Sequence, residues 1–273
     1  MTTSSAATAN ARHLAKYGAF IRVGFAEARA EPGELYARAA FLVVILGVFS
    51  ALWRAVGAVG TGGTGTADRG TMVWYLAMTE WMLMSAPQLH FDIEADVRRG
   101  DVAHQIARPA SYLASHVARG IGALGFRAPL LLVVACGAGA AFGGRPAHPV
   151  TLAGIVGIGI AAAISMSVWY ESIGLLAFWL GDIAPVYWIW QKLTFVLGGL
   201  LLPLTFYPSL VIHIAMLTPF PALLTGPASF VFVHPLIGAA ELITLLVFWF
   251  CIACVAATLL FRRATRILQV NGG

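Results

Sequence analysis

Residues 91–111 have the sequence FDIEADVRRGDVAHQIARPAS, a densely charged stretch in an otherwise apolar chain. The stretch holds three Asp, one Glu, three Arg and one His. Each charge would cost about 2.5–3.5 kcal/mol at the centre of a bilayer, so a run of this density belongs outside the hydrocarbon. The stretch is therefore predicted to stand in water, where it can contact a soluble partner.

The charged stretch contains the signals of a turn followed by a short helix. Gly100 permits a sharp turn, and Asp101 is a suitable cap for a helix over 101–107. Val102 and Ile106 share one face of that helix, which we expect to fill a groove in the partner. The full set of expected contact residues is Asp96, Arg98, Arg99, Gly100, Asp101, Val102, Ile106, Arg108 and Pro109.

The composition on either side of this stretch is that of an integral membrane protein. Of 273 residues 59% are hydrophobic and 11% are charged, whereas charged residues make up about a quarter of soluble domains. A span needs about 20 apolar residues, so the chain has room for roughly six helical spans in one all-α domain over 1–273. The predicted spans lie near 35–58, 71–90, 121–143, from 149 onward, 185–202 and 236–261.

Two further segments have a distinct character. Residues 9–31 interleave basic and apolar side chains, which is typical of a helix lying in the headgroup plane; a helix packed on the protein is the alternative. Residues 203–234 are apolar but interrupted by prolines, so we expect short re-entrant or interfacial helices there on the outer side. Trp169, Tyr170 and Glu171 are expected near a membrane face, just before a short loop.

The distribution of basic residues predicts the orientation. Most of the 17 Lys and Arg residues fall near the two termini or between residues 91 and 119. By the positive-inside rule both termini and residues 91–118 face the cytoplasm, while 59–70 and 144–148 face outward. The polar and then basic N-terminus does not resemble a secretory signal, which agrees with this orientation.

Several other motifs do not indicate chemistry. Gly60, Gly62 and Gly65 match G-x-G-x-x-G in letters, but no strand is expected before them. His90 and His104 have no third ligand at metal spacing, and the cysteines lie within apolar runs. The basic residues are not grouped with stacking aromatic residues, so no nucleic-acid partner is expected. We predict neither a catalytic site nor a metal site.

The chain resembles the permeases of type-2 ABC exporters, which are bacterial inner-membrane proteins. The resemblance lies in Asp92 to Pro109, and in residues 178–208, FWLGDIAPVYWIWQKLTFVLGGLLLPLTFYP. It implies that residues 91–118 hold a coupling helix for a separate ATPase subunit, and that a second permease, identical or different, helps to enclose the substrate path. The chain has no nucleotide-binding G-x-x-x-x-G-K-[ST] motif, so ATP and Mg²⁺ are expected on the partner and no cofactor in this chain.

Two other function classes stay open. An ion-coupled secondary transporter or channel would need a buried carboxylate, for which Glu80 is the candidate; a structural role in helix packing is the alternative for this residue. The other polar residues within predicted spans are Arg127, Lys192 and Glu241, of which Arg127 and Lys192 are expected to extend toward an interface. A membrane scaffold protein is the third class. The transported substrate is left open by the sequence.

Overall fold

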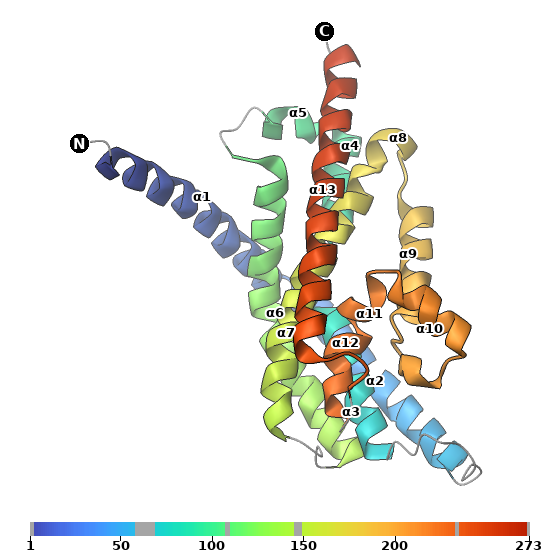
Figure 1. The fold of residues 1–273 in the computed structure, drawn as a ribbon. Coiled ribbons are helices and arrows are strands. Elements are labelled where there is room, and N and C mark those ends of the chain that lie inside the picture. Colours follow the sequence, from blue (N-terminus) through green and yellow to red (C-terminus); the bar gives the residue numbers. More distant parts are fainter. Residues whose placement is uncertain (1–2, 58–68, 107–109, 145–148, 233–234, 272–273) are drawn as a thin grey trace.

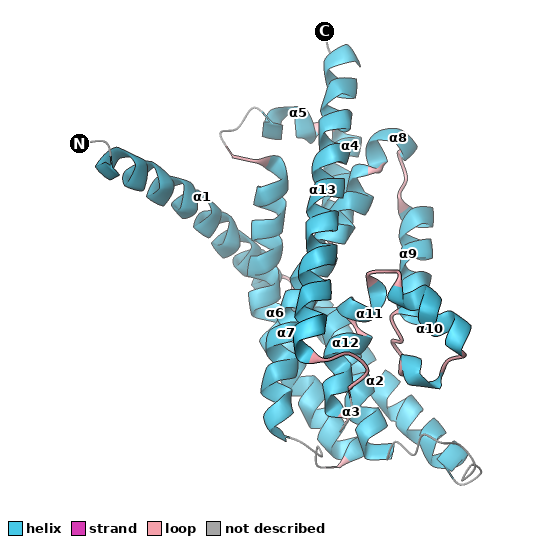
Figure 2. Cartoon of the chain, viewed as in Figure 1, coloured by secondary structure: helices cyan, strands magenta, loops and turns pink. Residues whose placement is uncertain are grey.

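The computed structural model describes residues 3–57, 69–106, 110–144, 149–232 and 235–271. In these ranges the chain forms helices and no strand (Figure 2). The helices are α1 (Thr3–Ala30), α2 (Pro32–Gly57), α3 (Arg69–Ser85), α4 (Leu89–Arg99), α5 (Asp101–Ile106), α6 (Tyr112–Gly143), α7 (Pro149–Leu175), α8 (Ala177–Leu180), α9 (Ala184–Leu197), α10 (Ser209–Met216), α11 (Phe220–Leu223), α12 (Thr225–Ala228) and α13 (Ala239–Asn271). The all-helical class is confirmed.

Four helical segments are long and apolar enough to cross a membrane. They are Pro32–Ala55, Tyr112–Gly143, Thr151–Leu180 and Ala239–Arg266. Helices also form at the second and fifth predicted spans, but α3 has 17 residues and α9 has 14. Four of the predicted spans are therefore long enough to cross a membrane, and six full spans stay a prediction.

Helix α3 lies inside the protein. Every residue from Met72 to Leu83 is buried, against α2, α6 and α7. The indole N–H of Trp81 donates to the carbonyl of Ala128 on α6 over 2.9 Å. A helix buried on all sides contacts protein rather than lipid.

Helix α9 ends at a pair of glycines, and side chains of other helices donate hydrogen bonds to the backbone carbonyls that follow it. Gly199 adopts a φ of +63°, which ends the helix. Tyr75 donates to the carbonyl of Gly199, and Thr79 donates to the carbonyl of Leu200 over 2.9 Å. Thr225 donates to the carbonyl of Gly198 over 2.6 Å. Hydroxyl groups from α3 and α12 thus satisfy backbone groups that could not be left unpaired in an apolar interior.

The proline-rich segment forms short helices, as predicted. A 3₁₀ turn, Leu204–Phe206, precedes α10, and a second, Ser229–Val231, follows α12. Residues 220–229 are all buried, and α11 and α12 both pack on α7. Gly226 is required there, since a Cβ atom would lie 2.4 Å from a methyl group of Leu242. The re-entrant character of this segment in the membrane stays a prediction.

Helix α1 extends beyond the predicted 9–31 and packs on α6 (Figure 1). Two glycines permit the contact: a Cβ atom on Gly24 would lie 2.0 Å from the carbonyl oxygen of Arg119, and one on Gly122 would lie 1.9 Å from that of Ile21. The alternative interpretation, a helix packed on the protein, therefore describes this part of α1. A position in the headgroup plane stays a prediction.

The capping of α9 predicts the effect of Thr79→Val, which keeps the shape of the side chain and removes its hydroxyl. The buried carbonyl of Leu200 loses its donor, so the free energy of unfolding in detergent should fall by about 1–3 kcal/mol. Thr244→Val is the matched control, because Thr244 is exposed and its hydroxyl donates to the carbonyl of Ala240 in the same helix. The control should stay within about 0.5 kcal/mol of the wild type. Equal stability of the two variants would contradict the capping role.

Candidate functional site

The charged stretch folds into a helical hairpin made of α4 and α5. Gly100 joins the two helices with a φ of +77°, and its N–H bonds to the carbonyl of Val97, so the predicted turn is confirmed. The hairpin lies at the end of the bundle where the C-terminal part of α13 emerges (Figure 1). Arg108 and Pro109, expected to end the short helix, lie outside the described residues.

The apolar face of the hairpin turns inward. Val102 is 1% exposed and packs in a cluster with Ile93, Tyr112 and Leu175. The prediction that Val102 contacts a partner is therefore wrong for this structure. The reason is that α5 packs back on α4, so that residues of α4, α6 and α7 cover Val102. Ile106 is 40% exposed and remains accessible.

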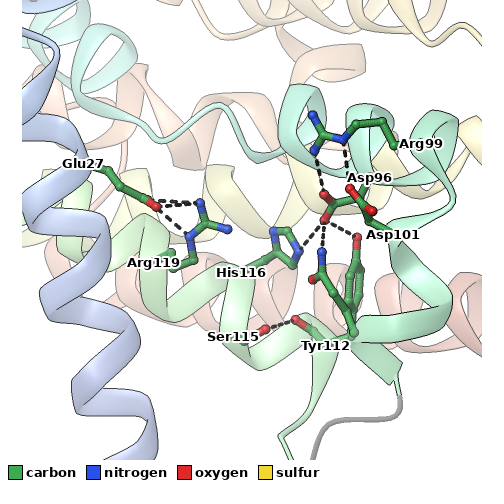
Figure 3. A network of polar contacts seen from close by, with 9 residues as sticks. Glu27, Asp96, Arg99, Asp101, Tyr112, Ser115, His116 and Arg119 are labelled. Carbon is green, nitrogen blue, oxygen red and sulfur yellow. Dashed lines mark hydrogen bonds and ion pairs between the residues drawn. The ribbon is translucent and has the colours of Figure 1, made fainter.

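Asp96 is the centre of a polar network that ties the hairpin to α6 (Figure 3). Its Oδ2 accepts hydrogen bonds from Gln105 at 2.8 Å and from Tyr112 at 3.3 Å, and lies 3.3 Å from Nε2 of His116. Its Oδ1 accepts from Arg99 at 3.1 Å. Asp96 is 7% exposed, so the prediction that it faces a partner is also wrong. Its carboxylate instead joins α4, α5 and α6.

The environment of Asp96 favours its charged form. Burial alone would raise the pKa of this carboxyl group. The hydrogen bonds from His116, Gln105 and Arg99, together with the charge of His116, act in the opposite direction and outweigh burial, so the pKa lies below its ordinary value. The network is therefore built around a carboxylate and not a carboxylic acid.

The outer surface of the hairpin carries the remaining predicted contact residues. Arg98 and Arg99 are exposed, and Asp101 is about half exposed. Arg99 pairs with both Asp96 and Asp101, so it connects the outer surface to the network beneath. Two cations and one apolar side chain, Ile106, are thus available to another protein.

A second ion pair continues the network along α6. Arg119 donates to Glu27 of α1 over 3.0 Å, one turn beyond His116 (Figure 3). Contacts made by α6 near its start therefore hold both the hairpin and α1. The sequence contains no signal that would have paired Glu27 with Arg119, which lie 92 positions apart.

A separate cavity of about 380 Å³ lies between α2, α3 and α9. Polar residues on its wall include Glu34, Arg38, Glu80, Gln88 and Gln191, among apolar neighbours. Glu80 is 2% exposed, and its Oε2 has no hydrogen-bond partner among the described residues. The cavity therefore contains one buried carboxyl group that the chain leaves without a full set of partners.

The other polar residues expected within spans, Arg127, Lys192 and Glu241, each have a different environment. Arg127 pairs with Glu34 in the first turn of α2, and Glu34 also pairs with Arg38. The extension of Arg127 toward an interface stays a prediction. The ammonium group of Lys192 lies over the rings of Trp188 and Phe195 at 5.2 and 5.4 Å. Glu241 is exposed in the first turn of α13. The i, i+4 spacing of Glu34 and Arg38 was the available signal for their pair.

Glu171 was expected close to a loop at a membrane face, but α7 continues past it to Leu175. Glu171 is 2% exposed and Tyr170 is 3% exposed, so both lie in the interior. A turn at Leu176, the short helix α8 and residues 181–183 follow before α9. Among the described residues no group of three or more His, Cys, Asp or Glu is placed to hold a metal ion.

Comparison with known proteins identifies the family. The model of the family described as ABC-2 family transporter protein matches residues 71–272, which include the hairpin, most of α3 and the break after α9. Comparison with curated protein sequences gave no match. Since the family match covers well over half of the chain, this protein is a membrane component of a transporter and belongs to the ABC-2 transporter family.

Proposed function

We propose that this chain is the permease subunit of an ABC exporter, driven by separate ATPase subunits that contact the α4–α5 hairpin. The observation that carries the proposal is the Asp96 network, because it fixes the hairpin to the start of α6, one of the four long apolar helices. A force applied to the hairpin is thereby transmitted to α6. A packed element of this kind moves as a unit between two arrangements.

The outer surface of the hairpin supports a contact with an ATPase. Arg98 and Arg99 would accelerate the encounter with an acidic surface, and Ile106 would enter an apolar depression in it. Val102 has no part in this contact, since it holds the hairpin to the rest of the permease. The coupling surface is therefore smaller than the sequence predicted.

We propose that the cavity between α2, α3 and α9 forms part of the substrate path. Its wall mixes charged, amide and apolar side chains, which suits an amphipathic substrate. Exposed apolar side chains on the adjoining helices, among them Val44, Ile189 and Leu210, are available to lipid or to a second permease that would close the path. Both termini and the hairpin are placed in the cytoplasm, as the basic residues predict.

One observation favours a second function, ion-coupled transport through Glu80. Its Oε2 is buried without a partner on the wall of the proposed path, where a coupling ion or proton could bind. Under the proposed function Glu80→Gln retains most transport at normal expression, because shape and hydrogen-bonding capacity are kept. Loss of transport in this variant, with ATPase binding intact, would support the ion-coupled alternative instead.

The coupling surface is tested by Ile106→Asp and Val102→Asp. Ile106→Asp should lower copurification with the ATPase at least about tenfold while the permease folds normally, because the side chain is exposed. Val102→Asp places a charge in the interior, so it should reduce the amount of folded permease. Gel filtration separates the two effects. Normal copurification and transport by Ile106→Asp would contradict the proposed coupling surface.

The Asp96 network predicts a pH-dependent loss of stability in Asp96→Asn. At neutral pH the variant should unfold about 1–3 kcal/mol more easily than the wild type, since donors that face a carboxylate lose its charge. Because the pKa of Asp96 is lowered in the folded state, this difference is complete above about pH 4 and is lost as pH falls through the folded pKa.

The matched control for Asp96→Asn is Glu94→Gln. Glu94 lies on the same helix, is partly buried, and pairs with the exposed Arg98 at 3.6 Å. A single long pair with one exposed partner contributes about 0–1 kcal/mol. Unfolding monitored by tryptophan fluorescence from pH 3 to pH 8 compares the variants. A stability difference for Asp96→Asn that does not shrink in acid would show that the charge of Asp96 is not what holds the network.

A further inference from the structure

An apolar groove of about 360 Å³ lies away from both the hairpin surface and the proposed path. Helices α1 and α13 form its walls, and α6 and α7 its floor; Figure 1 shows where these helices run. Its lining includes Ile21, Val117, Val168, Phe250 and Ala257. None of the residues that line the cavity between α2, α3 and α9 lines this groove.

One carboxyl group stands in this apolar lining. Among the described residues that line the groove, Glu171 alone carries a charged side chain. Glu171 is 2% exposed, and its Oε1 is buried and has no hydrogen-bond partner in the part of the chain that the structure describes. Buried polar atoms are nearly always paired, because an unpaired one costs free energy in an apolar environment. The chain therefore maintains a carboxyl group there without supplying its partner.

We propose that this groove binds a hydrophobic amine, with its ammonium group paired to Glu171 and its apolar body against α6, α7 and α13. An ammonium group supplies both of the missing components, a positive charge and hydrogen-bond donors. The apolar lining contributes affinity for the remainder of the ligand by removing apolar surface from water. An anionic ligand cannot form this ion pair.

The chemistry of the lining distinguishes this ligand from other occupants. A lipid tail packs against apolar walls but has no group that can pair with a buried carboxyl group. A hard metal ion needs several oxygen ligands, whereas the lining offers one carboxyl group and the hydroxyl groups of Tyr17 and Thr258 among apolar side chains. The pairing of a single charge with a mainly apolar body is specific to an amphipathic cation.

The test is equilibrium binding of pyrenemethylamine to the purified full-length permease in nanodiscs of phosphatidylcholine, followed by pyrene fluorescence. Pyrenemethanol is the matched neutral probe, with the same apolar body and no charge. The wild type should bind the amine at least about tenfold more tightly than the alcohol. Glu171→Gln should remove that difference, because it keeps the shape and removes the charge.

Two further variants make the result decisive. Ala114→Phe adds bulk within the groove and leaves Glu171 in place, so it should weaken binding of both probes. Glu241→Gln removes an exposed carboxylate outside the groove and should bind both probes as the wild type does. Gel filtration confirms that each variant is folded.

Three results would overturn the proposal. The first is equal affinity of the wild type for the amine and the alcohol, which describes an apolar crevice that lipid fills. The second is an unchanged preference for the amine in Glu171→Gln. The third is unchanged binding in folded Ala114→Phe, which would place the amine elsewhere. None of these measurements uses ATPase subunits or transport, so they do not depend on the proposed function.

Discussion

The structure depends on the rule that backbone carbonyls in an apolar interior need donors. Helix α9 stops after 14 residues, and the carbonyls of residues 198–200 are left without partners in their own helix. Tyr75, Thr79 and Thr225 supply the missing hydrogen bonds. Because two of these donors come from α3, the break in α9 fixes the position and rotation of the helix at the centre of the bundle. The short helices that follow are then held against α3 and α7.

The segment formed by α3 and α4 is held by polar contacts a second time, near the end of α4. Helix α4 follows α3 after three residues, and Asp96 near its end is bound to α5 and α6. The path from the capped carbonyls to the hairpin therefore runs through one short stretch, residues 75–100. Glu80 lies on this stretch and on the wall of the cavity. A displacement of the hairpin has a direct mechanical route to that cavity.

The sequence predicted the features that depend on local composition. Hydropathy located the long helices, Gly100 located the turn, and the prolines after residue 202 predicted short helices. It did not predict features that depend on contacts between distant residues. A four-residue spacing places Val102 and Ile106 on one face but cannot say whether the chain or a partner covers it. The partners of Asp96 lie up to 20 positions away, and the burial of Glu171 follows from the length of α7.

The buried carboxyl groups differ in what the chain provides for them. Asp96 receives donors from three helices, so the cost of burying its charge is offset within the chain, and its role is to hold those helices together. Glu80 and Glu171 each have a buried oxygen that finds no partner among the residues the structure describes, and each lines a cavity. Where the fold does not offset the free-energy cost of burying a carboxyl group, a bound proton or a bound ligand must offset it. Tyr170 and Glu171 are neighbours on α7, yet they line different cavities, so one helix separates the two places where such a ligand can bind.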